Sequence, residues 1–260
     1  MSKKLENATR LYLEGIRDGH AREAVTRYTG ERYTQHSTGV KDGVEGFVEF
    51  FEPFVERNPV RHLELVRGLV DGPYVFLQVY QELNHGEAKW ITTDLFDTDE
   101  DDKIVEHWDV IGPVSETSVS GHGQIDGPTE IEDLPATEAN KKVVSAFLTE
   151  VLKGGAYDRA SDFISPESYT QHNPGIADGL EGLASFVSEL KAQNRSLRYE
   201  DIFKVVGQGN FVVSYSRVSM GSEELAVFDI FRLKDGRIVE HWDNMEPIPP
   251  KEEWANSGKF

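Results

Sequence analysis

The amino-acid sequence predicts an α+β protein that consists of two tandem copies of one small domain. The first observation is an internal repeat: the sequence Tyr-Thr-Gln-His at 33–36 recurs at 169–172, and Ile-Val-Glu-His-Trp-Asp at 104–109 recurs letter for letter at 238–243. The second is that helical periodicity comes first in each copy and strand-like runs follow, which is typical of a sheet covered by helices on one face. A spacing this long is not a solenoid unit and indicates a duplicated domain.

Composition marks the boundaries of the copies. The stretch 114–136 is rich in Ser, Thr, Gly, Pro and acidic residues and has no apolar period, which is linker composition. Pro247, Pro249 and Pro250 stop regular structure after the second copy. We therefore expect copy one at residues 1–113, a linker at 114–136 and copy two at 137–250.

Each copy is expected to begin with three helices. The first helix is expected at 5–16 in copy one and at 143–151 in copy two. The second helix is expected at 21–28 in copy one and at 156–163 in copy two. The third follows an Asp-Gly-x-Glu-Gly motif that starts at Asp42 in copy one and at Asp178 in copy two. We interpret this motif as a turn and a helix start rather than as chemistry.

Strands are expected to complete each copy. After a short extended segment at 33–36, copy one has strand-like runs at 62–70, 74–83, 88–97 and 103–111. Asn84-His85-Gly86-Glu87 is typical of a hairpin turn. Short turns between successive runs indicate an antiparallel meander, with the helices closing one face of a curved sheet.

The charge and composition exclude several classes of function. The net charge is −19, with 46 acidic against 27 basic residues, so the surface repels nucleic acid and anionic lipid. We interpret the acidic surface as favouring solubility. Adaptation to a high-salt habitat is the alternative interpretation. Cysteine is absent, which excludes disulfides and thiol catalysis. No signal peptide and no apolar run of ~20 residues is present, so we expect a cytoplasmic protein with no membrane partner.

Strand alternation brings ionisable side chains together. His107 and Asp109 share one face of the last strand of copy one, and Asp94 lies beside Phe96 on the strand before it. A carboxylate among apolar neighbours is costly to bury without a partner, so we expect Asp94 to meet His107. The corresponding residues of copy two are Asp229, His241 and Asp243.

The combined motifs resemble the SnoaL-like branch of the nuclear-transport-factor-2-like superfamily. Copy two carries the pattern most completely, with Asn173-Pro174 after its histidine and Gly236-Arg237 before its last strand. Copy one departs from it with Ser37-Thr38 and Asp102-Lys103 at these places. The resemblance implies tandem cone-shaped domains of NTF2-like or cystatin-like fold. Each would be a curved, mostly antiparallel sheet closed by three helices around a deep apolar pocket.

The resemblance also implies acid/base catalysis without a cofactor. The reaction would be an aldol cyclisation, isomerisation or hydration of a small apolar carbonyl compound. An apolar pocket moves carboxyl and imidazole pKa values toward neutrality, where proton transfer is efficient. The acid/base role would fall to Asp109 and Asp243 or, failing them, to Asp94 and Asp229, beside His107 and His241. The substrate-binding residues would be Tyr33, His36, Phe96, Tyr169, His172 and Phe231.

Other interpretations remain beside the catalytic one. A buried His–Asp pair can serve only to fix strand register. The same pocket can belong to a non-catalytic binding module, or copy two alone can be active because it keeps the complete pattern. His36 and His172 suit hydrogen bonds to loop backbone better than substrate contact. A metal site of His36, His107 and Asp109 matches no closed zinc pattern, so no metal is expected.

The two tryptophans of the repeated strand suggest how the copies associate. Trp108 is expected on the face of its strand opposite His107, and Trp242 on the face opposite His241. In sheets of this kind, the face that carries the tryptophans often forms a dimer surface. The copies can then pack sheet to sheet as an intrachain pseudo-dimer, and further homo-oligomerisation is an option. The expected ligand is a small apolar molecule.

Overall fold

The computed structural model describes residues 2–260, which form two compact units. The first unit runs to Pro113 and also includes Ile248–Phe260, and the second is Val114–Pro247. These boundaries differ from the expected ones. Residues 114–136, expected as a linker, belong to the second unit, and the segment after the second copy belongs to the first. Backbone groups of both segments hydrogen-bond to buried histidines, which composition alone does not reveal.

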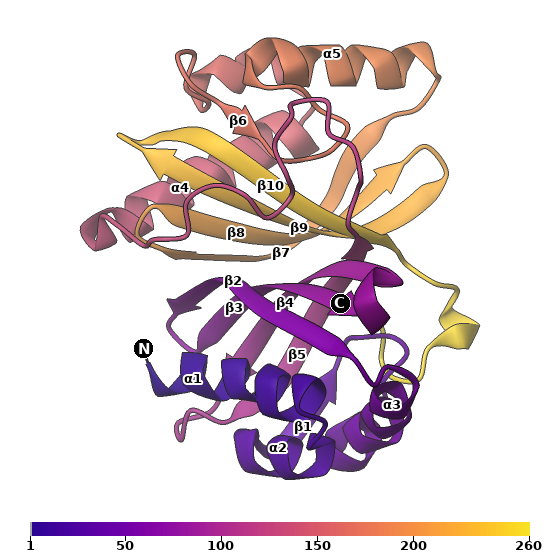
Figure 1. Cartoon of the computed structure of the whole chain (residues 1–260). Coiled ribbons are helices and arrows are strands. Elements are labelled where there is room, and N and C mark those ends of the chain that lie inside the picture. The colour runs from indigo at the N-terminus through magenta and orange to yellow at the C-terminus, as the bar shows by residue number, and fades with distance from the viewer. Residues whose placement is uncertain (1) are drawn as a thin grey trace. The chain divides into compact units, whose positions relative to one another are not determined.

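The first unit places three helical segments against one face of a mixed sheet (Figure 1). Its helices are α1 (Lys3–Arg10), continued by the π-helical turn η1 (Leu11–Arg17), then α2 (Ala21–Tyr28) and α3 (Gly43–Arg57). Its strands are β1 (Thr29–Gln35), β2 (Arg61–Asp71), β3 (Tyr74–Leu83), β4 (Ala88–Thr98) and β5 (Ile104–Pro113). They are ordered β1-β5-β4-β3-β2, with β1 parallel to β5 and the other pairs antiparallel.

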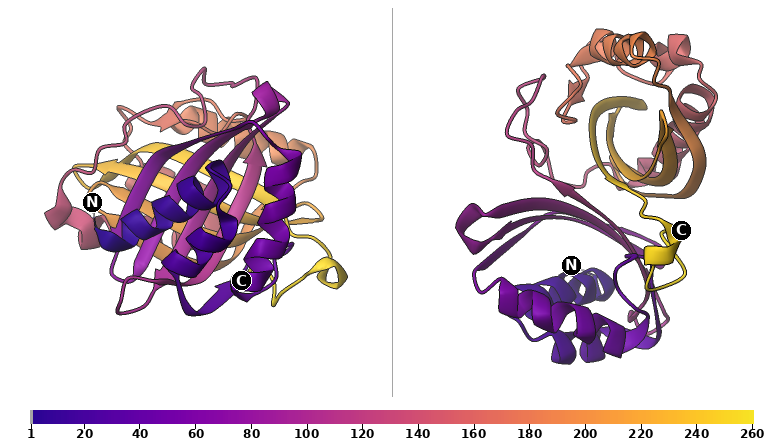
Figure 2. Two further views of the ribbon diagram at one scale, coloured as in Figure 1. Left: turned by 60° about the horizontal axis from the view of Figure 1, so that its bottom comes forward. Right: turned by 90° about the vertical axis from the view of Figure 1, so that its right-hand side faces the viewer.

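The second unit repeats this arrangement, and its sheet is visibly curled in the right-hand view of Figure 2. Its helices are α4 (Thr137–Phe147), η4 (Leu148–Lys153), the 3-10 segment η5 (Tyr157–Asp162) and α5 (Gly179–Ala192). Its strands are β6 (Thr170–Gln171), β7 (Leu197–Gln208), β8 (Phe211–Met220), β9 (Glu223–Lys234) and β10 (Arg237–Pro247). The order is β6-β10-β9-β8-β7, again with the short first strand parallel to the last.

The predicted α+β class is therefore confirmed, with helices first and an antiparallel meander after them. The hairpin at 84–87 is present as a tight turn in which Asn84, His85 and Gly86 all have positive φ. No helix among residues 2–260 is both long enough and apolar enough to cross a membrane. In copy two the second helix is reduced to the 3-10 segment η5.

The repeated Asp-Gly-x-Glu-Gly motif fixes the end of β1 against α3. Gly43 has φ +79°, and a Cβ on Gly46 would lie 2.1 Å from the carbonyl oxygen of Lys41, so the turn requires glycine at both places. The Asp42 carboxylate accepts a hydrogen bond of 2.8 Å from the backbone of Gln35. Asp178, Gly179 and Gly182 repeat these features in copy two. The motif thereby holds Gln35, which reaches the candidate site, at a fixed position.

Candidate functional site

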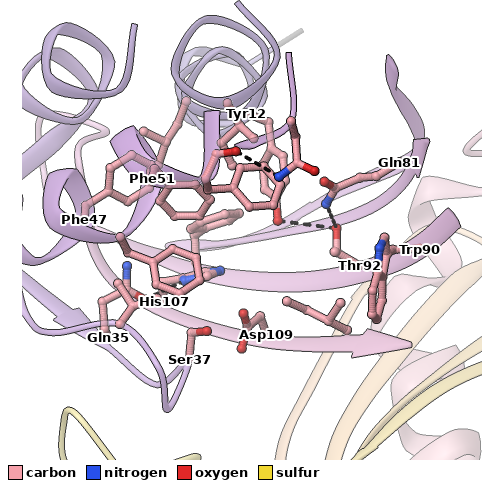
Figure 3. Close-up of a pocket in the computed structure, with 18 of the residues that line it drawn as sticks. Tyr12, Gln35, Ser37, Phe47, Phe51, Gln81, Trp90, Thr92, His107 and Asp109 are labelled. Carbon is pink, nitrogen blue, oxygen red and sulfur yellow. Dashed lines mark hydrogen bonds between the residues drawn. The ribbon is translucent and has the colours of Figure 1, made fainter. Parts of the chain in front are cut away.

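A cavity of about 470 Å³ lies between the helices and the sheet of the first unit. This volume is in the range of small-molecule sites. The cavity is lined largely by apolar side chains, among them Phe47, Phe50, Phe51, Phe54, Trp90, Phe96 and Ile111. Polar groups enter it at a few points, and Figure 3 shows Tyr12 coming from the helical side and His107 and Asp109 from strand β5.

Strand register gathers three ionisable side chains on this face of the sheet. Asp94 of β4 lies directly opposite Asp109 of β5, and Phe96 lies opposite His107. Side chains of opposed residues share a face, so both carboxylates stand beside the imidazole. Nε2 of His107 lies 2.9 Å from Oδ1 of Asp94, as the alternation predicts. Two carboxylates this close repel each other unless a proton or a cation intervenes.

His107 has a partner at each ring nitrogen. Its Nδ1 lies 2.8 Å from Oε1 of Gln35, whose amide nitrogen donates to the hydroxyl of Tyr33 at 2.8 Å. The amide oxygen therefore faces the imidazole, and Nδ1 is the donor. Nε2 and Asp94 then share the remaining proton. The ring also stacks on Phe96, with centroids 4.7 Å apart, so its orientation is fixed.

Asp94 lies behind His107 rather than on the cavity wall. Burial raises the pKa of its carboxyl and the charge of Asp109 adds to this, against hydrogen bonds from His107 and Tyr12. The Tyr12 hydroxyl donates to Oδ1 at 2.6 Å. Among residues 2–260, no group makes a hydrogen bond to Oδ2. Asp94 is thus suited to hold His107 in place, and it is not among the residues that line the cavity.

Asp109 is the carboxylate on the cavity wall. Burial alone would raise its pKa, but the charges of Lys259 and His107 and hydrogen bonds from Lys259 and Ser37 outweigh burial and lower it below its usual range. Nζ of Lys259 lies 2.9 Å from Oδ1 of Asp109. The cavity therefore presents an ionised carboxylate to an otherwise apolar interior.

His36 does not line the cavity, so the structure does not bring it to the place that its predicted substrate contact requires. Side chains alternate at the end of β1: Gln35 points to the cavity and His36 to the other face of the sheet. There His36 bonds to Glu106 at 2.9 Å and to the carbonyl of Gly258 at 2.6 Å, and stacks on Trp108 with centroids 5.0 Å apart. His36 is thus hydrogen-bonded to a backbone carbonyl, as the alternative interpretation from the sequence states.

His172 of the second unit is placed in the same way and does not line the small cavity. Its ring bonds to Glu240 at 2.8 Å and to the carbonyl of Gly123 at 2.7 Å. It stacks on Trp242 with centroids 4.5 Å apart. Each tryptophan of the repeated strand is therefore covered by a histidine of its own unit.

The second unit has a corresponding histidine–aspartate pair, but its cavity is only about 60 Å³ in volume. Nε2 of His241 lies 3.1 Å from Oδ1 of Asp229, and Nδ1 lies 3.0 Å from Oε1 of Gln171. Tyr169, Phe231 and Asp243 line the small cavity, as their counterparts Tyr33, Phe96 and Asp109 line the large one. The larger volume in copy one weighs against the alternative interpretation that copy two alone is active.

The two units satisfy their buried carboxylates differently. Asp229 accepts hydrogen bonds from Tyr199 on β7 and from Ser214 on β8, whereas Asp94 accepts one from Tyr12 on η1. A tyrosine thus reaches the same carboxylate from unrelated elements, which indicates that the buried acid needs this donor. Asp243 is bonded at 2.6 Å by the amide of Asn173, and burial and Asp229 raise its pKa.

Sequence reasoning missed several of these residues. Gln35 and Gln171 stood inside a repeated motif, so the repeat itself was a signal for their role as imidazole partners. Tyr12 and Lys259 had no such signal, because neither belongs to a repeated motif and both act at long range along the chain.

The residues present do not suit a metal ion. Ligand atoms of Asp94, His107 and Asp109 lie within 4.8 Å of one another, a spacing that a cation can bridge. Both nitrogens of His107 are already hydrogen-bonded, and the Lys259 ammonium occupies Asp109. His36, the third member of the trio considered from the sequence, is on the other face of the sheet. The trio of His36, His107 and Asp109, which was not expected to bind a metal, is not assembled.

The sheet order, the helices on one face and the enclosed carboxylate define a cone-shaped α+β pocket domain. Residues 144–241 match the family model of the SnoaL-like domain. This match lies within the second copy, and the sheet order of the second copy is repeated in the first. No sequence among curated proteins matches it.

Solved structures with a similar fold come from several bacteria. A Bacillus cereus protein assigned as a polyketide cyclase is 21% identical, covering 42% of this chain and 73% of its own, with a TM-score of 0.37. An LEH-like epoxide hydrolase of M. tuberculosis is 22% identical, with coverages of 43% and 86% and a TM-score of 0.34. A Xanthomonas campestris protein of cystatin-like fold is 17% identical, with coverages of 46% and 98% and a TM-score of 0.35.

Proposed function

We propose that the first copy is a cofactor-free acid/base enzyme acting on a small apolar carbonyl compound, and that the second copy is chiefly structural. The observation that carries this proposal is Asp109, an ionised carboxylate on the wall of an apolar cavity of about 470 Å³. Reactions of this class include aldol cyclisation and isomerisation. Both begin with removal of a proton from the carbon beside a carbonyl group.

In the proposed step the carboxylate of Asp109 accepts that proton. The C–H bond breaks, its electron pair forms an enolate, and the carbonyl oxygen gains negative charge. The amide of Gln81 and the hydroxyl of Thr92 line the cavity and can donate hydrogen bonds to that oxygen. Asp109 then returns its proton to the carbon or oxygen of the product, so no cofactor is consumed.

The His107–Asp94 pair would support this chemistry without touching the substrate. Both ring nitrogens of His107 are engaged, so neither is free to take a substrate proton. Burial raises the pKa of Asp109, and His107 is, after Lys259, among the neighbours that lower it. In this proposal Asp109 is the catalytic residue, and His107, Asp94 and Gln35 are positioning residues.

The second candidate is a binding module that uses the same cavity without catalysis. The observation that favours it is the complete hydrogen bonding of His107, which also suits a purely structural pair. In that case a carbonyl ligand would bind beside Asp109 and leave unchanged.

Hydrogen–deuterium exchange at carbon separates the two candidates. The full chain is incubated in D2O with a panel of alicyclic and aromatic ketones and 1,3-diketones, and loss of the proton beside the carbonyl is followed by NMR. We expect faster exchange than in buffer with an equal concentration of acetate for at least one compound. Binding of panel compounds without any acceleration would favour the binding module instead.

A further inference from the structure

We propose that Lys259, carried by the segment that follows the second copy, is a positioning residue that sets the pH range over which Asp109 of the first copy works. The inference rests on the proposed role of Asp109 as a base. Its direct evidence is a contact between residues 150 positions apart: Nζ of Lys259 donates to Oδ1 of Asp109 at 2.9 Å. The side chains are only 2% and 6% exposed. A lysine is rarely buried this deeply without a carboxylate partner.

The segment that carries Lys259 is anchored by several hydrogen bonds to the loop after β1. The backbone of Ala255 donates to Thr38 at 2.8 Å, and the amide of Asn256 donates to the carbonyls of Ser37 and Val40 at 2.6 and 2.8 Å. Ser37 and Val40 also line the cavity. Lys259 is therefore delivered to Asp109 from a fixed backbone beside the cavity.

Copy two provides an internal comparison. Gly123 bonds to His172 through its carbonyl just as Gly258 bonds to His36, so each copy has an anchoring segment of this kind. Among residues 2–260, the hydrogen-bonding side chain recorded at Asp243 is Asn173, a neutral amide. The ammonium group of Lys259 beside Asp109 thus has no counterpart among the hydrogen-bond partners of Asp243. The pKa of Asp109 is lowered and that of Asp243 is raised, in line with this difference.

The remaining charged and titratable neighbours are similar in both copies. Asp94 on β4, His107 on β5, Tyr33 on β1 and Tyr12 on η1 surround Asp109. Their counterparts around Asp243 are Asp229, His241, Tyr169 and Tyr199. Lys259 in place of Asn173 is therefore the main electrostatic difference between the two carboxylates.

An opposite charge within ~4–6 Å lowers a carboxyl pKa by about 1–3. Lys259 then has two consequences for a base. Asp109 stays ionised at a lower pH, and its intrinsic basicity falls with its pKa. Removal of the charge should shift the acid limb of the activity profile to higher pH and leave the plateau rate unchanged or higher. A purely structural lysine would instead lower the plateau and leave the limb in place.

The test uses the full chain with Lys259→Gln, which leaves a neutral donor as Asn173 does in copy two. Carboxyl 13C NMR follows the titration of Asp109 and Asp243 in the same sample, with Asp109→Asn to assign the signal. We expect the Asp109 midpoint to rise toward that of Asp243, while Asp243 itself does not move. Lys259→Arg should keep the wild-type midpoint, and exposed Lys251→Gln on the same segment is the matched control.

Two results would overturn the inference: an Asp109 midpoint that does not move in folded Lys259→Gln, or an exchange profile whose acid limb does not follow that midpoint. Should Lys259→Gln fail to fold, the wild-type chain still decides, because equal midpoints for Asp109 and Asp243 would overturn the inference. The titration needs no turnover. A shifted midpoint in a chain without exchange activity would therefore refute the proposed function and uphold the electrostatic role of Lys259.

Discussion

Replacing Asp109 with Asn should reduce the exchange of carbon-bound protons by about 10²–10⁴-fold, the usual contribution of a positioned general base. Asn keeps the shape of the side chain but cannot accept the proton. The matched variant is Asp243→Asn, which makes the same change beside a cavity of only about 60 Å³. It should leave the rate close to that of the wild type. The measurement is the NMR exchange assay in D2O.

The design needs one control because Asp109→Asn leaves the buried Lys259 ammonium without its anion. Breaking one side of a buried ion pair commonly costs about 3–5 kcal/mol of folding stability. The double variant Asp109→Asn/Lys259→Gln removes both charges and should fold better yet stay inactive. Exchange activity that survives in either folded variant, or that disappears in Asp243→Asn, would contradict the assignment of the base.

Replacing Trp242 with Ala should destabilise the second unit by about 3–5 kcal/mol, the range found for large buried aromatic side chains. Trp242 is 0% exposed, stacks on His172, and donates its indole N–H to the carbonyl of Asp126 at 3.0 Å. The change leaves a cavity and also frees the segment around Asp126. Urea unfolding followed by circular dichroism measures the effect.

Phe203→Ala is the control in the same unit, because Phe203 is aromatic but 42% exposed. Its loss should cost less than about 1 kcal/mol. Equal effects for the two variants would show that Trp242 is not a centre of packing in this unit. Loss of the stack should also change the environment of His172, which its NMR signals would report.

Much of the fold could be predicted from the sequence because it depends on local periodicity. The repeated motifs revealed the duplication, and alternation along β5 and β10 placed His107 beside Asp94 and His241 beside Asp229. The glycines of the Asp-Gly-x-Glu-Gly motif mark a turn that only glycine fits. These features are written in short stretches of chain and repeat in both copies.

The rest could not be predicted because it depends on long-range contacts and on volume. Tyr12 reaches Asp94 from a helix and Lys259 reaches Asp109 from the far end of the sequence, and neither contact has a local pattern. The contrast between cavities of about 470 and 60 Å³ arises from the sizes of many side chains together. The completeness of the family motif in copy two therefore did not indicate which copy has the larger cavity.

The position of a bound ligand tests the central claim most directly. A ketone that exchanges in the presence of the protein should be crystallised with the full chain. We predict that it occupies the cavity of the first unit, with the carbon beside its carbonyl within reach of the carboxylate of Asp109. A ligand found instead beside Asp243, or bound to the first unit away from Asp109, would contradict the claim.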